Sequence, residues 1–80
     1  MRNVVILGST GSVGTQAVDV ITTRPEQFNV VGLSAGGSSL DLLTDQVLAL
    51  DPDLVALADP QAAASLRARV PGVEVWDGPD

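Results

Sequence analysis

The feature of this sequence that most constrains its fold is a regular alternation of two apolar patterns. Short continuous apolar runs are typical of strands buried on both faces of a parallel sheet, and they stand at residues 3–7, 28–33, 54–57 and 73–75. Segments with apolar side chains at helical spacing separate these runs, at residues 12 to about 23, 40–50 and 62–70. Helix ends are predicted at Pro25, at the DPD turn 51–53 and at Pro71-Gly72.

This order predicts an α/β fold, because consecutive parallel strands need a crossover connection that is usually a helix. We expect a partial Rossmann-type, doubly wound parallel sheet of four strands in the order 3-2-1-4, with three helices on both faces. Ser38 or Ser39 is placed to cap the second helix. Four strands are half of such a fold, so residues 1–80 are expected to be the N-terminal part of a larger cofactor-binding domain.

The composition narrows the classes of function. The 80 residues have a formal net charge of −6, with four arginines and neither lysine, histidine nor cysteine. An acidic chain repels nucleic acid and anionic lipid, so neither is an expected partner. The lack of cysteine excludes a disulfide framework, and no apolar run approaches the ~20 residues that cross a bilayer. A cytoplasmic location without membrane attachment is the expectation.

The segment ILGSTGSVG places Gly8, Gly11 and Gly14 between the first strand and the first helix. In such a turn the first glycine lets the chain leave the strand sharply, the second lets a phosphate approach the backbone, and the third allows close helix packing. The N–H groups of the first helical turn then face an anion. The predicted diphosphate site is the backbone of Thr10, Gly11, Ser12 and Val13.

This loop has two other possible interpretations. Its GxxGxxG spacing differs from the GxGxxG of the common NAD fingerprint, so a tight strand–helix turn without a nucleotide stays open. A P-loop is excluded, because that motif needs a lysine and the chain has none.

The loop after the second strand indicates which dinucleotide binds. An NAD site usually has Asp or Glu there, which binds the ribose 2′-hydroxyl. Here the strand ends at Leu33 and continues as SAGGSS, residues 34–39, with no carboxylate before Asp41. This small, hydroxyl-rich loop leaves room for a 2′-phosphate and favours NADP(H), although it lacks the usual cation. The alternative is a plain strand–helix connection.

No residue of the chain is predicted to be catalytic or to bind a metal. The acidic residues that could be considered stand in turns or near the end of the sequence, where carboxylates are usually solvated: Glu26, Asp51, Asp53, Asp77 and Asp80. Arg67 and Arg69 on the third helix are expected to be solvated charges. Trp76 is expected to be a packing residue that is partly exposed.

The stretch ILGSTGSVGTQAVDVI, followed by RPEQFNVVGLSAGG, resembles the start of the 1-deoxy-D-xylulose 5-phosphate reductoisomerases. The resemblance covers nearly all 80 residues and is densest over residues 4–37; Asp19-Val20, Pro25 and Phe28 add to it. It implies an NADPH-dependent oxidoreductase of isoprenoid biosynthesis by the non-mevalonate route. That enzyme rearranges and reduces 1-deoxy-D-xylulose 5-phosphate to 2-C-methyl-D-erythritol 4-phosphate, needs Mg or Mn, and is expected to be a homodimer.

The resemblance also implies roles for particular residues. The glycine loop would contact the NADPH phosphates through Thr10 to Val13, and the second loop would contact the 2′-phosphate end through Gly36, Gly37 and Ser38. Many members of the family have Lys-Asn where this chain has Gly37-Ser38. The metal ligands, substrate site and catalytic and C-terminal domains of the family lie outside these 80 residues, so the chain alone is expected to be inactive.

Two alternative functions stay open. One is an NADP-dependent semialdehyde-type dehydrogenase, such as aspartate-semialdehyde dehydrogenase, whose loop usually reads GATGxVG where this chain has Ser9. The other is a nucleotide-binding module without catalytic activity.

Overall fold

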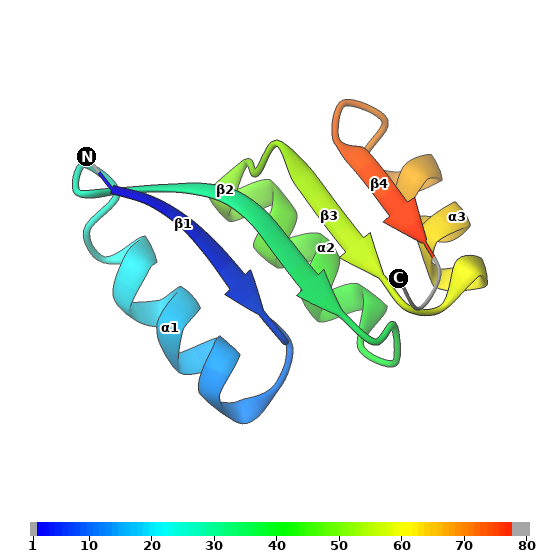
Figure 1. The fold of residues 1–80 in the computed structure, drawn as a ribbon, viewed down its shortest axis with the longest axis horizontal. Helices are drawn as coiled ribbons and strands as arrows, with labels where there is room; N and C mark the ends of the chain where they lie inside the picture. The colour runs from blue at the N-terminus through cyan, green and yellow to red at the C-terminus, as the bar shows by residue number, and fades with distance from the viewer. Residues whose placement is uncertain (1, 78–80) are drawn as a thin grey trace.

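Strands and helices alternate along the chain in the predicted order. The computed structural model describes residues 2–77, so Asp80 lies outside the described residues. The elements are β1 (Arg2–Leu7), α1 (Ser12–Thr22), β2 (Phe28–Ala35), α2 (Leu40–Leu50), β3 (Leu54–Leu57), α3 (Pro60–Arg69) and β4 (Glu74–Asp77) (Figure 1). All neighbouring strands are parallel, which confirms the α/β class. None of the helices in this part of the chain is long and apolar enough to span a bilayer.

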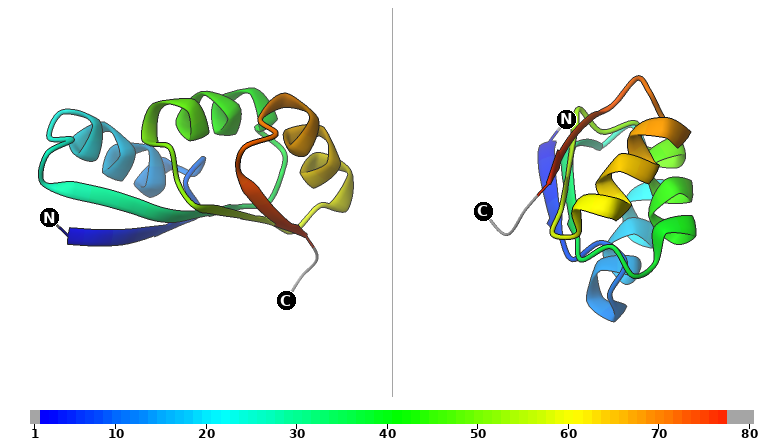
Figure 2. Two further views of the ribbon diagram at one scale, coloured as in Figure 1. Left: turned by 90° about the horizontal axis from the view of Figure 1, so that it is seen from above. Right: turned by 90° about the vertical axis from the view of Figure 1, so that its right-hand side faces the viewer.

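The strand order is β1-β2-β3-β4, so the predicted order 3-2-1-4 is wrong. The fourth strand pairs with β3, Val75 opposite Val55, instead of returning to β1. The three helices consequently lie on one face of the sheet (Figure 2). Crossovers between parallel strands are right-handed, so a chain that adds each strand on the same side also places each helix on the same face. The alternation of elements is identical for both topologies and does not specify the side on which a strand is added.

The core is a single layer between the sheet and the helices. Ile6, Leu33, Val55 and Val75 belong to the buried apolar cluster, one from each strand. The helices contribute the buried side chains of Val18, Ile21, Leu43, Val47, Ala62, Ala63 and Leu66 to it. On the other face of the sheet Val5 and Trp76 are 60% and 55% exposed, so the strands of residues 2–77 are buried on one face only. The exposure of Trp76 agrees with its prediction.

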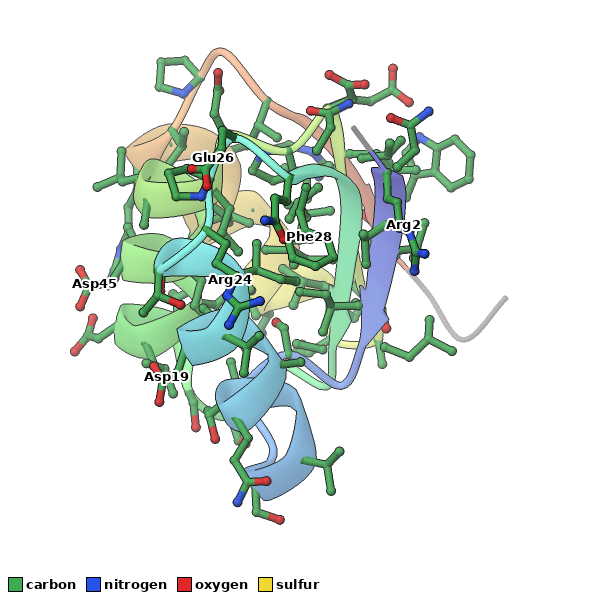
Figure 3. All side chains as sticks on the ribbon, turned by 90° about the vertical axis from the view of Figure 1, so that its left-hand side faces the viewer. Arg2, Asp19, Arg24, Glu26, Phe28 and Asp45 are labelled. Atoms are coloured by element: carbon green, nitrogen blue, oxygen red, sulfur yellow. The ribbon has the colours of Figure 1, made fainter. Side chains whose placement is uncertain are left out.

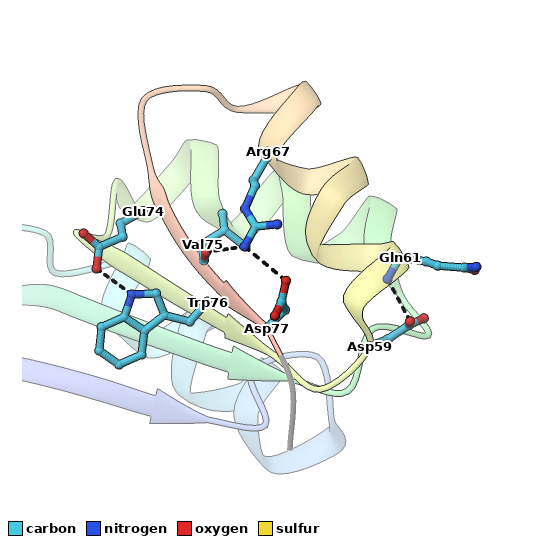
Figure 4. A network of polar contacts seen from close by, with 7 residues as sticks. All are labelled: Asp59, Gln61, Arg67, Glu74, Val75, Trp76 and Asp77. Atoms are coloured by element: carbon cyan, nitrogen blue, oxygen red, sulfur yellow. Dashed lines mark hydrogen bonds and ion pairs between the residues drawn. The ribbon is translucent and has the colours of Figure 1, made fainter. Parts of the chain in front are cut away.

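Local interactions determine where the helices begin and end. The helix α3 begins at Pro60, two residues before its predicted start, because the carboxylate of Asp59 accepts a 3.0 Å hydrogen bond from the N–H of Gln61 (Figure 4). Ser39 occupies the N-cap position of α2, but its side chain makes no capping hydrogen bond. At the other end of α2, Asp51 adopts a left-handed conformation with φ of 50° and donates its N–H to the carbonyl of Val47.

Candidate functional site

Three loops meet at the edge of the sheet where the strands have their carboxyl ends. They follow β1, β2 and β3 and comprise residues 8–11, 36–39 and 58–59 (Figure 1). Because all four strands are parallel, these loops lie side by side. Ligands of open α/β sheets bind at this edge. The structure therefore brings together the two loops that the sequence predicts to bind a nucleotide.

The glycines of the first loop have the predicted backbone roles. Gly8 has a φ of +67°, a conformation that L side chains rarely adopt, and it turns the chain off β1. A Cβ at Gly14 would collide with the carbonyl of Gly8 and would lie 2.8 Å from the Cα of Ser9. The start of α1 can therefore pack against the turn only because residue 14 is glycine.

The end of the glycine loop and the first turn of α1 present backbone donors without acceptors. The N–H groups of Thr10, Ser12 and Val13 have no acceptor among residues 2–77, and no side chain caps the helix. The N–H of Gly11 donates to the carbonyl of Gly8 at 2.9 Å, so this residue contributes space and not a donor. A helix N-terminus with free N–H groups carries a partial positive charge and attracts phosphate.

Two side chains that the sequence analysis did not assign to the site hold the glycine loop in place. The Oγ of Ser34, in β2, accepts a 3.2 Å hydrogen bond from the N–H of Gly8. The backbone carbonyl of Ser34 accepts a 2.9 Å hydrogen bond from the N–H of Ser9. The Nε2 of Gln46, in α2, donates to the carbonyl of Ser9 at 2.7 Å. Gln46 stands three residues after Leu43 on the apolar face of α2, and a polar residue in that place is the signal that could have identified it.

The interior of the glycine loop is polar. Ser9 is completely buried and Gln46 is almost so, yet Ser9 Oγ and Gln46 Oε1 have no hydrogen-bond partner among residues 2–77. Buried polar atoms in proteins are nearly always bonded, so an unpartnered pair marks this as an unusual part of the core. The loop is suited to a diphosphate. It has free N–H donors and a polar interior, and its glycines keep its surface open.

The second loop is held by the end of β3. The N–H of Asp59 donates to the carbonyl of Gly36 at 3.2 Å, which extends the pairing of the two strands. Gly37 has a φ of +117° and packs against Asp59 and Ala62. The loop itself carries no carboxylate before Asp41, but the turn after β3 places Asp59 beside Gly37. Gly36 and Ser38 are exposed.

The arginines of α3 are exposed, as expected for solvated charges, and each also makes an ion pair. The Nη2 of Arg67 donates to the carbonyl of Val75 at 2.8 Å and to Asp77 at 3.2 Å (Figure 4). The Nη1 of Arg69 lies 2.7 Å from the carboxylate of Asp41. Arg2 and Arg24 lie at the opposite, amino edge of the sheet (Figure 3). Across residues 2–77, then, no arginine stands unpaired beside the second loop, and no cluster of three acidic side chains could hold a metal.

A hollow at the amino edge offers no competing site for a phosphate. This cavity of about 470 Å³ lies between α1, α2 and β2 and is lined by side chains that include Ile21, Phe28 and Leu50. Its wall carries no charged side chain. This hollow therefore does not compete with the carboxyl edge for an anion. A second hollow at the amino edge is lined by one positive and one negative side chain, Arg2 and Glu26, with Gln27 and Phe28.

A glycine loop between a parallel strand and a helix, with free N–H groups at the carboxyl edge of the sheet, is the architecture of dinucleotide-binding α/β domains. The model of the 1-deoxy-D-xylulose 5-phosphate reductoisomerase family matches residues 4–80. The chain belongs to the 1-deoxy-D-xylulose 5-phosphate reductoisomerase family.

Individual relatives agree with this assignment. The reductoisomerase of Rhodococcus jostii is 54% identical over 77 residues, which are 96% of this chain and 18% of that protein. The enzyme of Corynebacterium glutamicum is 49% identical over 81 residues, 99% of this chain and 20% of that protein. The chain thus spans about a fifth of the length of these relatives. These matches do not favour the semialdehyde dehydrogenase or the module without catalytic activity.

Solved structures of the same family have the same fold. The reductoisomerase of Zymomonas mobilis in complex with NADPH superposes with a TM-score of 0.88 at 28% identity, covering 96% of this chain and 21% of that one. A reductoisomerase in complex with NADPH, fosmidomycin and magnesium has a TM-score of 0.88 at 23% identity, covering 99% of this chain and 20% of that one. This chain, whose strand order is 1-2-3-4, is thus closely similar in fold to these proteins.

Proposed function

We propose that this segment binds NADPH along the carboxyl edge of its sheet. The diphosphate binds at the start of α1, and the 2′-phosphate end of the adenosine binds at the second loop. The proposed cofactor-binding residues are Thr10, Gly11, Ser12, Val13, Gly36, Gly37 and Ser38. The observation that carries the proposal is the group of unpaired N–H donors at the start of α1, next to the loop that follows β2.

The proposed residues have different roles in binding the cofactor. The N–H groups of Thr10, Ser12 and Val13 donate to phosphate oxygens, while Gly11 leaves the space through which the phosphates reach them. The hydroxyl and N–H of Ser38 are donors at the exposed end of the second loop. The bound NADPH supplies the hydride of the reduction, and this segment holds and orients the half of the cofactor remote from that hydride.

Residues 1–80 are proposed to be the N-terminal part of the NADPH-binding domain of a full-length reductoisomerase. That enzyme rearranges and reduces 1-deoxy-D-xylulose 5-phosphate to 2-C-methyl-D-erythritol 4-phosphate, with a divalent metal, Mg or Mn, whose ligands come from other parts of the protein. Reductoisomerases of similar fold are described in complex with magnesium, which supports the metal. The 80 residues alone are predicted to be inactive, and the whole protein is proposed to be a cytoplasmic homodimer.

The test is a titration of the full-length protein with NADPH and NADH, followed by the quenching of its intrinsic fluorescence. NADPH is expected to bind more tightly than NADH. A preference for NADH of tenfold, about 1.4 kcal/mol, would contradict the assignment of the second loop to a 2′-phosphate. Failure of both cofactors to bind would contradict the whole proposal.

A further inference from the structure

We propose that Asp59 is a specificity-determining residue, which weakens the preference of this chain for a 2′-phosphate over a 2′-hydroxyl on the adenosine ribose. The inference rests on the proposed function and names the residue that sets how strongly the site favours NADPH over NADH. It starts from Gly37, the position at which the family resemblance implies a lysine in many members.

The backbone at Gly37 excludes a cationic side chain. Its φ of +117° is strained for any residue with a Cβ. A Cβ there would also lie 2.9 Å from the Cβ of Ala62, closer than real Cβ atoms approach, and 3.0 Å from that of Asp59, which is a tight contact. Ala62 is buried and Asp59 is fixed by its bonds, so neither can yield easily. The loop therefore takes up a 2′-phosphate without a lysine at this position.

Asp59 places a negative charge next to that loop. Its N–H bonds the carbonyl of Gly36, and its Cγ would lie 3.8 Å from a Cβ at Gly37. The other acidic residue near the second loop, Asp41, is paired with Arg69, whereas no arginine pairs with Asp59 in the part of the chain that the structure describes. This carboxylate stands at the N-cap of α3, two residues after the end of β3, and not at the end of the second strand, where NAD-binding domains have the carboxylate that bonds the 2′-hydroxyl.

The same carboxylate also offsets the partial positive charge at the start of α3. Its Oδ1 accepts the N–H of Gln61, so this helix N-terminus already has an anion (Figure 4). A dianionic 2′-phosphate meets repulsion from Asp59 and receives little attraction from α3, while a neutral 2′-hydroxyl is affected by neither. The difference in binding free energy between a ligand with a 2′-phosphate and one with a 2′-hydroxyl is therefore small.

The experiment compares two fragments of the cofactors, 2′-phospho-ADP-ribose and ADP-ribose, which differ only at the ribose 2′ position. Their dissociation constants are measured by calorimetry on the full-length protein. The unchanged protein is expected to bind both, with a preference for the 2′-phosphate below about tenfold. Asp59→Asn keeps an N-cap acceptor and removes the charge. It should tighten 2′-phospho-ADP-ribose about threefold or more and change ADP-ribose by less than about twofold, with the gain shrinking at high salt.

Matched variants isolate the effect of this charge. Asp59→Ser also retains a capping oxygen and repeats the test should the asparagine variant fold poorly. Asp53→Asn removes one charge from an exposed turn at the other edge of the sheet and should leave the ratio unchanged. An unchanged ratio in both Asp59 variants would overturn the role of Asp59, and so would an equal change for both ligands. If neither fragment bound the unchanged protein, the proposal that this segment binds NADPH would be contradicted.

Discussion

The side-chain amide of Gln46 donates a 2.7 Å hydrogen bond to the backbone carbonyl of Ser9, 37 residues earlier in the chain. Gln46 is 4% exposed and Ser9 is not exposed at all. The contact joins α2 to the middle of the glycine loop, so the helix that follows the second loop positions the first one. The two loops of the proposed NADPH site are thereby coupled through the core.

Replacing Gln46 by methionine should destabilise the protein and weaken NADPH binding. Methionine fills a similar volume but leaves the carbonyl of Ser9 buried and unpaired, which should lower the free energy of unfolding by about 1–3 kcal/mol. The loss of this anchor should also weaken NADPH binding. Urea denaturation and NADPH titration measure the two effects. Asp45→Asn, on the exposed neighbour of Gln46, serves as the control (Figure 3). Full NADPH affinity in a destabilised Gln46→Met protein would show that the bond supports the fold alone.

Gly11, in the glycine loop, and Gly14, in the first turn of α1, should respond to substitution in opposite ways. A side chain at Gly11 meets only the carbonyl of Gly8, at 3.3 Å from the Cβ, so Gly11→Val should change the free energy of unfolding by less than about 1 kcal/mol. The valine would fill the space proposed for the diphosphate, and NADPH affinity should fall at least tenfold, or about 1.4 kcal/mol.

Gly14→Ala is the counterpart, because its Cβ would collide with the backbone of Gly8 and Ser9. It should lower the free energy of unfolding by about 1–3 kcal/mol. The comparison uses the same urea and NADPH titrations. Equal losses of stability and affinity in Gly11→Val would argue against a cofactor role for this loop.

Asp51 offers a position at which the protein can be stabilised. Its φ of 50° at the end of α2 costs an L residue about 1–2 kcal/mol, which glycine does not incur. Part of this gain is offset by the greater freedom of glycine in the unfolded chain, so Asp51→Gly should add about 0.5–1 kcal/mol. Asp51→Val should instead destabilise the protein, because a β-branched residue is poorly tolerated in this conformation. A lower urea midpoint for Asp51→Gly than for the unchanged protein would contradict the prediction.

The two arginines of α3 should contribute unequally to stability. Arg67 donates to a backbone carbonyl in β4 as well as to Asp77, so Arg67→Met should cost about 1 kcal/mol. Arg69 pairs with an almost fully exposed Asp41, and Arg69→Met should cost less than about 0.5 kcal/mol. Urea denaturation at low and high salt measures both costs. The loss at Arg69 should disappear at high salt, whereas most of the loss at Arg67 should persist. Equal costs for the two variants would contradict this account.

The parts of this structure that the sequence predicted correctly depend on local interactions. Apolar runs became strands, amphipathic segments became helices, and Gly8 and Gly14 have the backbone roles that a strand–helix turn requires. Each of these features is determined within one strand–loop–helix unit. The family assignment likewise follows from a continuous stretch of residues.

The parts that the sequence did not predict depend on the packing of distant segments. The fourth strand pairs with the free edge of β3 and not with that of β1, and no local pattern encodes that choice. The contact of Gln46 with Ser9, the support of Gly8 by Ser34 and the position of Asp59 beside Gly37 all join different units. The proposed roles of the seven cofactor-binding residues stay predictions.

The strand order has a consequence for how the protein folds. Each strand pairs with the next one in the chain, so no pairing in the described sheet spans more than one strand–helix–strand unit. The loops that must close during folding are therefore short, which lowers their entropic cost and favours rapid folding. During synthesis, β1 and β2 can pair before β3 has left the ribosome, and each later strand then meets a preformed edge. A doubly wound order would have required β4 to return to β1 past two strands already in place.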